Sequence, residues 1–193
     1  PPKVRQAISD KIRRLNLYPD SGCILLRERL AKKLGVDPDQ VIVGHGSNYL
    51  IELISRSCLN PGDEGVTCDP SFVFYQRAIK GAIGSHKSIP LRNFEVDMTD
   101  LLNSLSHRTR LIFLGSPNNP TGKIIPFAKL KLFMDRLDRN VLVVLDEAYF
   151  DYVDSPDARS GLELLKDHQN LIVLRTFSKI YGLAGLRIGY GIG

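Results

Sequence analysis

A lysine at position 179 stands where a side chain can do covalent chemistry. The segment Thr176-Phe177-Ser178-Lys179 comes just after an apolar run at 171–174, and two hydroxyl groups precede the lysine. Most loop lysines are surface residues, and that is the simplest interpretation. A lysine held partly out of water at a strand end, however, can lose its proton and attack a carbonyl. Lys179 is therefore a candidate for covalent catalysis.

A second chemical group follows another apolar run, at 141–145. Asp146 and Glu147 come at its end, followed by Ala148 and Tyr149. A buried carboxylate needs a partner, because burying a lone charge is costly. A helix N-cap would supply one. A more specific partner is the N–H of a bound pyridinium ring, which an aspartate would keep protonated.

Two further polar turns follow apolar runs. The turn at 116–122 is rich in proline and asparagine, as many turns are, but its Asn119 could hydrogen-bond a phenolic oxygen. The segment at 44–48 offers backbone N–H groups at the start of a helix, which is an anion site. It is not a dinucleotide fingerprint, because Tyr49 occupies the third glycine position.

An arginine follows Lys179 by eight residues. Arg187 lies between Leu186 and Ile188 at the start of a strand pattern. An arginine in such a place is usually paired with a carboxylate. Its fork geometry would equally suit a phosphate group.

Alternating strand and helix patterns would bring these groups together. Strand patterns occur at 41–43, 64–68, 85–90, 110–115, 141–146, 171–174 and 186–192, and those at 110–115, 141–146 and 171–174 are β-branched or leucine-rich runs. Helical patterns occur at 48–58, 72–80, 127–137 and 162–168. This alternation predicts an open α/β sheet with helices on both faces. Ligands of such sheets bind beyond the carboxyl ends of the strands, where the polar turns would meet.

Composition narrows the classes of function. The chain has 193 residues and a net charge of +5, but its basic residues are mixed with 21 acidic ones, which argues against nucleic-acid binding. No apolar run is long enough for a membrane span, and the N-terminus has no signal-peptide core. The cysteines Cys23, Cys58 and Cys68 have no metal-binding spacing, so we expect no metal site, buried thiols and a cytoplasmic location.

Taken together, the ordered motifs resemble the fold-type I pyridoxal-phosphate-dependent aminotransferases, and most closely the histidinol-phosphate aminotransferase branch. The resemblance runs from Tyr18 to Gly193. It rests on Tyr-Pro-Asp at 18–20, Gly-His-Gly-Ser at 44–47, Ser-Pro-Asn-Asn-Pro-Thr-Gly at 116–122, Asp-Glu-Ala-Tyr at 146–149, and Thr-Phe-Ser-Lys with Gly-Leu-Arg-Ile-Gly within 176–189. It implies a mostly parallel seven-stranded sheet and pyridoxal 5′-phosphate as cofactor.

The resemblance implies a role for each residue at the cofactor ring. Lys179 would hold the cofactor as a Schiff base and then carry the proton, and Asp146 would pair with the ring nitrogen. Asn119 and Tyr149 would hydrogen-bond the phenolic oxygen. Phe72 would stack on the ring face, although a core phenylalanine is an equally good interpretation.

The resemblance also implies a phosphate site and a subunit interface. Residues expected to hold the phosphate are Gly46, Ser47, Asn48, Thr176, Ser178 and Arg187. Tyr18 would reach the phosphate of the neighbouring subunit in a homodimer, or would be an exposed loop residue. The segment at 45–49 reads His-Gly-Ser-Asn-Tyr where this branch often has Asn-Gly-Ser-Asp-Glu. That departure weakens the case for one substrate.

The implied organisation is a helical segment at 1–17 and a cofactor-binding large domain at 18–193, without the small C-terminal domain. The implied reaction transfers an amino group from histidinol phosphate to 2-oxoglutarate, and the chain by itself would be poorly active. Alternatives are a threonine-phosphate decarboxylase, an aromatic aminotransferase, or a non-catalytic module of the same fold. The substrates would be small molecules.

Overall fold

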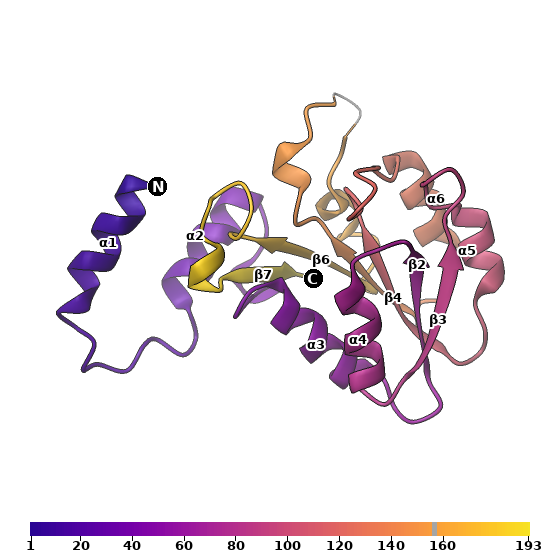
Figure 1. Ribbon diagram of the computed structural model, residues 1–193, viewed down its shortest axis with the longest axis horizontal. Helices are drawn as coiled ribbons and strands as arrows, with labels where there is room; N and C mark the ends of the chain where they lie inside the picture. The colour runs from indigo at the N-terminus through magenta and orange to yellow at the C-terminus, as the bar shows by residue number, and fades with distance from the viewer. Residues whose placement is uncertain (156–157) are drawn as a thin grey trace.

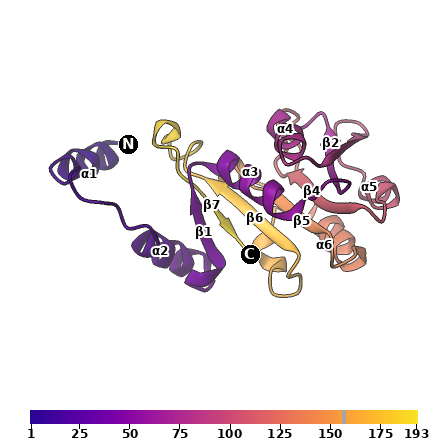
Figure 2. The same ribbon diagram turned by 90° about the horizontal axis from the view of Figure 1, so that it is seen from below.

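A seven-stranded sheet runs through the molecule in the order β1-β7-β6-β5-β4-β2-β3 (Figures 1 and 2). The structure is a computed structural model that describes residues 1–155 and 158–193. The strands are β1 (Val41–Gly44), β2 (Glu64–Asp69), β3 (Ser85–Pro90), β4 (Thr109–Gly115), β5 (Leu142–Asp146), β6 (Leu171–Thr176) and β7 (Gly189–Ile192). All seven expected strands are confirmed, as is the mostly parallel α/β fold.

Strand direction brings the polar turns to one edge. Strands β3, β2, β4, β5 and β6 pair in parallel, and β7 is antiparallel to both β6 and β1. Strand β1 therefore points the same way as β6. The ends of β1, β4, β5 and β6 share an edge with the start of β7, where Gly189 pairs with Gly44 and Thr176.

Helices cover both faces of the sheet. Helices α3 (Ser47–Cys58) and α4 (Val73–Gly81) cover one face, and α2 (Ile24–Leu34), α5 (Met98–Ser104) and α6 (Phe127–Arg136) pack on the other (Figures 1 and 2). Successive strand residues alternate between the two cores. In β4, Phe113 packs with the α3 and α4 side chains, while Ile112 and Leu114 belong to the other core. This alternation follows from the two-residue repeat of a strand.

Two expected elements are wrong in part. The helix predicted at 162–168 is only a short 3-10 turn, Gly161–Leu164. Its start is held by the side chain of Glu147, which accepts hydrogen bonds from the Ser160 hydroxyl and the Gly161 N–H. The strand predicted from Leu186 begins only at Gly189, because Arg187 has a left-handed backbone with φ of 52°.

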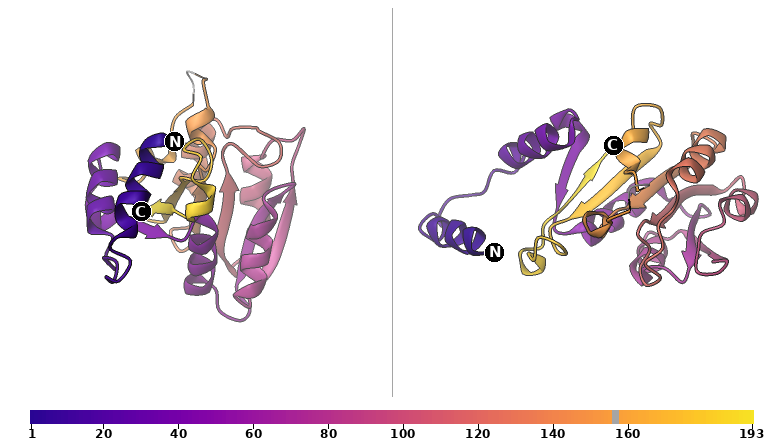
Figure 3. Two further views of the ribbon diagram at one scale, coloured as in Figure 1. Left: turned by 60° about the vertical axis from the view of Figure 1, so that its left-hand side comes forward. Right: turned by 90° about the horizontal axis from the view of Figure 1, so that it is seen from above.

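The N-terminal segment stands away from the sheet. Helix α1 (Pro2–Ile12) has no buried residue, and an extended connection leads from it to α2 (Figures 1 and 3). Of the cysteines, only Cys68 is buried, so the prediction of buried thiols is wrong for Cys23 and Cys58, which lie in helix-end positions with partial exposure. Among the described residues, none of the helices combines the length and apolarity that a bilayer crossing requires.

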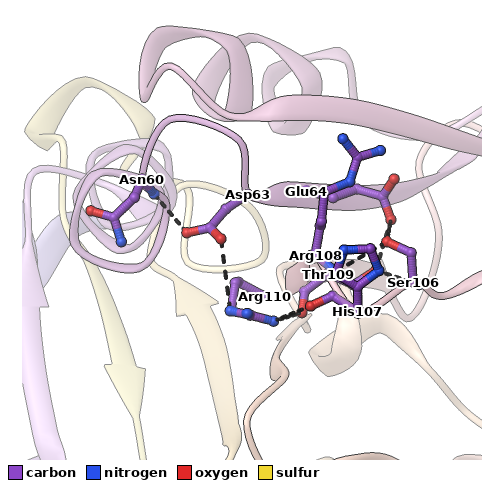
Figure 4. Close-up of polar contacts among 8 residues, drawn as sticks. All are labelled: Asn60, Asp63, Glu64, Ser106, His107, Arg108, Thr109 and Arg110. Atoms are coloured by element: carbon purple, nitrogen blue, oxygen red, sulfur yellow. Dashed lines mark hydrogen bonds and ion pairs between the residues drawn. The ribbon is translucent and has the colours of Figure 1, made fainter.

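A polar cluster ties the amino ends of β2 and β4 together (Figure 4). The buried Glu64 carboxylate accepts hydrogen bonds from Thr109 Oγ1 at 2.7 Å and from Ser106 Oγ at 3.2 Å. Beside it, the Arg110 guanidinium lies 3.8 Å from the Asp63 carboxylate. These contacts lie at the edge of the sheet opposite to the polar turns, and they fix the loop that leads into β4.

Candidate active site

A cleft of about 240 Å³ opens at the carboxyl edge of the sheet. Its lining joins the ends of β4, β5 and β6 to the first residues of α3. The lining residues are Ser47, Asn48, Phe72, Tyr75, Pro117, Asn119, Asp146, Ala148, Tyr149, Thr176, Ser178, Lys179, Ala184 and Arg187. Every residue expected at the site lies on this surface except Gly46, which adjoins it, and Tyr18.

Asp146 ends β5 at the base of the cleft and is buried. Its Oδ1 accepts a hydrogen bond from the Ala148 N–H at 3.0 Å, and its Oδ2 accepts one from the Tyr75 hydroxyl at 3.0 Å. Burial raises the pKa of Asp146 to about 6, against the opposing effect of these two hydrogen bonds. The carboxylate thus lacks a full complement of partners and faces the cleft.

Tyr75 was not among the residues expected from the sequence. It lies in α4, one helical turn after Phe72, and its ring stacks on Phe113 with centroids 5.1 Å apart. The spacing of three residues from Phe72 places both rings on one side of the helix. That spacing was the available signal, but the tyrosine also fits an ordinary core position.

Glu147, the next residue, has a different environment. Its side chain is buried and contacts Arg175, whose Nη2 lies 2.6 Å from Glu147 Oε2. The Ser160 hydroxyl and the Gly161 N–H also donate to it. Burial raises the pKa of Glu147, whereas Arg175 and these donors act in the opposite direction. This carboxylate does not line the cleft and serves the structure.

The two asparagines of the 116–122 turn divide their tasks. The buried Asn118 donates through Nδ2 to the Pro70 carbonyl at 3.0 Å and to Thr121 Oγ1 at 3.1 Å. Its backbone also bonds to Lys123 and Gly122. Asn118 therefore holds the turn, and the partly exposed Asn119 is left to face the cleft.

Lys179 lies in the loop between β6 and β7, on the cleft wall. Its Nζ is 5.0 Å from the centroid of the Tyr149 ring, and its positive charge lowers the pKa of Asp146. The sequence left two interpretations open, a surface loop lysine and a lysine partly withdrawn from water, and in the described chain Lys179 is exposed. Its loop contributes Ser178, Lys179 and Ala184 to the lining of the cleft.

The end of the cleft at the start of α3 depends on close backbone approaches. Helix α3 begins at Ser47, and Gly46 before it has φ of 81°. A side chain at Gly46 would lie 2.4 Å from Arg187 Nη2, and one at Gly189 would lie 2.4 Å from the Ser47 nitrogen. The glycines thus allow the helix N-terminus, the start of β7 and the arginine to meet.

Hydroxyl groups and Arg187 complete that end. Thr176 Oγ1 accepts a hydrogen bond from the Ser178 N–H at 3.1 Å. Arg187 donates to the Ala184 carbonyl at 2.8 Å and to Ser178 Oγ at 3.4 Å. Within residues 1–155 and 158–193, its guanidinium has no carboxylate partner at ion-pair distance. The usual structural reason for such an arginine therefore does not apply there.

Two aromatic residues bear on the alternatives left open by the sequence. Phe72 precedes α4, packs partly against the core beside Tyr75 and also lines the cleft, so it occupies both environments considered for it. Tyr18 is fully exposed and does not contribute to the cleft of its own chain. Among the described residues, no group of three or more His, Cys, Asp and Glu side chains is placed to hold a metal ion.

Comparison with known proteins places this arrangement in a family. Residues 1–193 match the family described as Aminotransferase class I and II. The chain is 43% identical to histidinol-phosphate aminotransferase 2 of Carboxydothermus hydrogenoformans, covering 98% of this chain and 53% of that protein. It is 44% identical to histidinol-phosphate aminotransferase of Moorella thermoacetica, covering 99% and 50%.

Solved structures agree with the sequence comparison. The crystal structure of histidinol-phosphate aminotransferase from Sinorhizobium meliloti in complex with pyridoxal-5′-phosphate has a TM-score of 0.94 and 32% identity, over 100% of this chain and 52% of that one. The chain spans about half the length of the curated relatives it matches. Because the family match extends over all 193 residues, the chain belongs to the aminotransferase class I and II family.

Proposed function

We propose that this chain binds pyridoxal 5′-phosphate and takes part in amino transfer from histidinol phosphate to 2-oxoglutarate. One observation carries the proposal: Lys179, Asp146 and the first residues of α3 line a single cleft. The relatives named histidinol-phosphate aminotransferase support the choice of amino donor. The choice of 2-oxoglutarate as acceptor rests on family likeness.

The chain's residues fit the cofactor at three points. Asp146 would accept a hydrogen bond from the protonated ring nitrogen, Asn119 and Tyr149 would hydrogen-bond the phenolic oxygen, and Phe72 would lie against the ring. The partly satisfied Asp146 carboxylate supports the first contact, since a pyridinium would supply the missing positive partner. When bound, the cofactor supplies an electron sink that makes the substrate's Cα–H bond acidic.

The phosphate group would lie at the other end of the cleft. The first N–H groups of α3 have no partner within the helix and carry a partial positive charge. Gly46, Ser47 and Asn48 would present these donors, with the hydroxyls of Thr176 and Ser178 beside them. Arg187 would provide the balancing charge, which its lack of a carboxylate partner among the described residues supports.

Lys179 would have two tasks in this account. Its amine would bind the cofactor's aldehyde, and after release it would move the proton between the substrate Cα and the cofactor's C4′ atom. The position of Lys179 Nζ above the Tyr149 ring fits both tasks. Tyr149 would hydrogen-bond the phenolic oxygen of the cofactor, so the amine would lie near the neighbouring aldehyde carbon. The exposed position of Lys179 leaves a path for substrate from solvent.

We further propose a cytoplasmic homodimer in which Tyr18 reaches the partner's phosphate site. Tyr18 is fully exposed, and its neighbours Leu15 and Leu17 are exposed apolar residues. Together with the unburied α1 they form a surface that a second copy could cover. Three unpaired thiols fit a reducing compartment.

Absorption spectroscopy with added pyridoxal phosphate tests the proposal. A visible band should appear with the wild-type protein and vanish on borohydride reduction. The Lys179→Ala variant should not give the band, whereas Lys33→Ala, which removes a lysine of α2, should keep it. Equal spectra for wild type and Lys179→Ala would contradict the assignment.

Turnover assays separate the possible reactions. Histidinol phosphate, threonine phosphate and an aromatic amino acid would be offered in turn, with 2-oxoglutarate as acceptor. Glutamate formation with histidinol phosphate is the expected result. Carbon dioxide release would indicate a decarboxylase, and a bound cofactor without turnover of any donor would indicate a non-catalytic module.

A further inference from the structure

Tyr75 connects two sides of the cleft. Its hydroxyl donates a hydrogen bond to Asp146 Oδ2 at 3.0 Å. Its ring meets the Phe72 ring edge to face, with centroids 5.5 Å apart and an interplanar angle of 87°. One buried side chain thus contacts both the carboxylate expected at the ring nitrogen and the aromatic residue expected at the ring face.

Tyr75 itself is held firmly. It is almost completely buried, and its ring lies parallel to that of Phe113 in β4, at 5.1 Å and 6°. Adjacent aromatic rings in this geometry attract each other beyond the effect of burial alone. The hydroxyl therefore has little freedom, and it fixes the plane of the carboxylate that it contacts.

The hydrogen bond also has a definite direction. Burial, and after it the Asp146 charge, raises the pKa of Tyr75 well above its ordinary value, so the hydroxyl keeps its proton and donates. The other ionisable groups that act on this pair are Glu147, Tyr149 and Lys179. Donation from Tyr75 favours the charged form of the Asp146 carboxyl, which burial disfavours.

We propose that Tyr75 is a positioning residue, which orients the Asp146 carboxylate and keeps it charged so that it can hold a protonated ring nitrogen. The inference rests on the proposed binding of pyridoxal phosphate. With Oδ2 bonded to Tyr75 and Oδ1 bonded to the Ala148 N–H, the remaining lone pairs of the carboxylate are available to the ligand.

A comparison of two ligands tests this role. The variants Tyr75→Phe and Tyr190→Phe would each be titrated with pyridoxal phosphate and with its analogue in which the ring nitrogen is replaced by CH. Tyr190 is the matched control, because it is a buried tyrosine that packs in the core on the opposite face of the sheet. Thermal unfolding without ligand would show whether each variant is folded.

The expected result is selective. Tyr75→Phe should raise the Kd for pyridoxal phosphate about tenfold, as the loss of one hydrogen bond to a charged group would. Its Kd for the analogue should change less than about twofold, because the analogue has no nitrogen for Asp146 to hold. Tyr190→Phe should leave the ratio of the two Kd values unchanged.

Other outcomes overturn the inference in distinguishable ways. If Tyr75→Phe weakens both ligands equally, the tyrosine only shapes the cleft. If it weakens neither, its hydrogen bond does not serve the ligand. If the wild-type protein binds neither ligand, the proposed function fails together with the inference. If Tyr75→Phe fails to fold, Asp146→Asn is titrated with the two ligands in its place. An equal loss of affinity for both ligands would then show that the Asp146 carboxylate does not hold the ring nitrogen, and the role proposed for Tyr75 would fail with it.

Discussion

Asp146 and Glu147 are adjacent acidic residues, and both are buried, yet their environments differ. Glu147 has the guanidinium of Arg175 and two further donors. Asp146 has a tyrosine hydroxyl and one backbone N–H, and no cation among the described residues lies within ion-pair distance of it. The chain thus completes the partners of one carboxylate and leaves the other open toward the cleft.

The difference separates a carboxylate that is fully paired within the fold from one that is proposed to bind the cofactor. Successive residues at a strand end point to opposite sides, so burial alone does not distinguish them. Glu147 ties the end of β5 to Arg175 in β6 and to the 160–161 turn. Asp146 can still bind a positively charged ligand. Without that ligand, its buried carboxylate has no cationic partner among the described residues, and this lowers the stability of the protein.

The largest expected effect on stability comes from breaking the ion pair between Glu147 and Arg175. Glu147→Gln should lower the free energy of unfolding by about 3–5 kcal/mol, because the buried Arg175 charge would lose its nearest carboxylate and, among the described residues, keep only Asp151, at 3.6 Å. Urea unfolding measures this value. The double change Glu147→Leu with Arg175→Met should recover most of the loss. A loss below about 1 kcal/mol in the single variant would remove the distinction drawn here.

Asp146→Asn should raise the free energy of unfolding at neutral and higher pH, whereas Glu147→Gln lowers it. A carboxyl whose pKa rises on folding, here from 3.8 to about 6, binds its proton more tightly in the folded state. Its contribution therefore lowers stability progressively as the pH rises from about 4 through about 6. At pH 8 the asparagine variant should be more stable than the wild-type apo chain by about 1–3 kcal/mol, and the gain should disappear near pH 4.

The control for this prediction is the cofactor. The variant that is more stable without pyridoxal phosphate should bind it more weakly than the wild type does. Unfolding curves at pH 4, 6 and 8, with and without cofactor, measure both effects. Equal stability of the two proteins at every pH would show that Asp146 is as well compensated as its neighbour.

The adjacent asparagines offer a smaller version of the same contrast. Asn118→Ala should cost about 1–3 kcal/mol, because it removes the hydrogen bonds that the buried Asn118 side chain makes to Pro70 and Thr121. Asn119→Ala should change stability by no more than about 0.5 kcal/mol. It should instead raise the Kd for pyridoxal phosphate. Chemical unfolding and cofactor titration of both variants measure the contrast, and a reversal of the two effects would contradict it.

Tyr18→Ala should have the smallest effect on the folded chain. The side chain is fully exposed, so stability should change by less than about 0.5 kcal/mol. In the proposed dimer, however, it should weaken activity. Mixing this variant with Lys179→Ala should restore part of that activity, because mixed dimers contain one complete site. No restoration after subunit exchange would argue against a shared site.

The sequence was sufficient to predict the strands and polar turns that form the site, but not the side-chain contacts within it. Each of the predicted strands is present. The signal is clearest for the central strands β4, β5 and β6, because buried parallel strands are continuous apolar runs bounded by turns. Since the polar turns follow those runs, their meeting at one edge could also be foreseen. The helices α2 and α5 were missed, although α2 carries leucines at 26, 30 and 34, which is helical spacing; α5 is only seven residues long.

The remaining differences depend on contacts between distant residues. The helix expected at 162–168 is absent because the turn before it bonds to Glu147. Tyr75 could not be assigned to the site, because its partner lies 71 residues away. Nor does the sequence state how much water reaches Lys179, since this depends on which elements cover the cleft.

The central claim is that the amine of Lys179 binds pyridoxal phosphate, and mass spectrometry tests it most directly. The protein would be mixed with the cofactor, reduced with borohydride and digested, and the pyridoxyl group located in the peptides. The account predicts that the pyridoxyl group is on Lys179. It also predicts that the label is lost when excess inorganic phosphate competes for the proposed phosphate site beside Arg187. Labelling of another lysine, or labelling spread over the surface lysines, would contradict it.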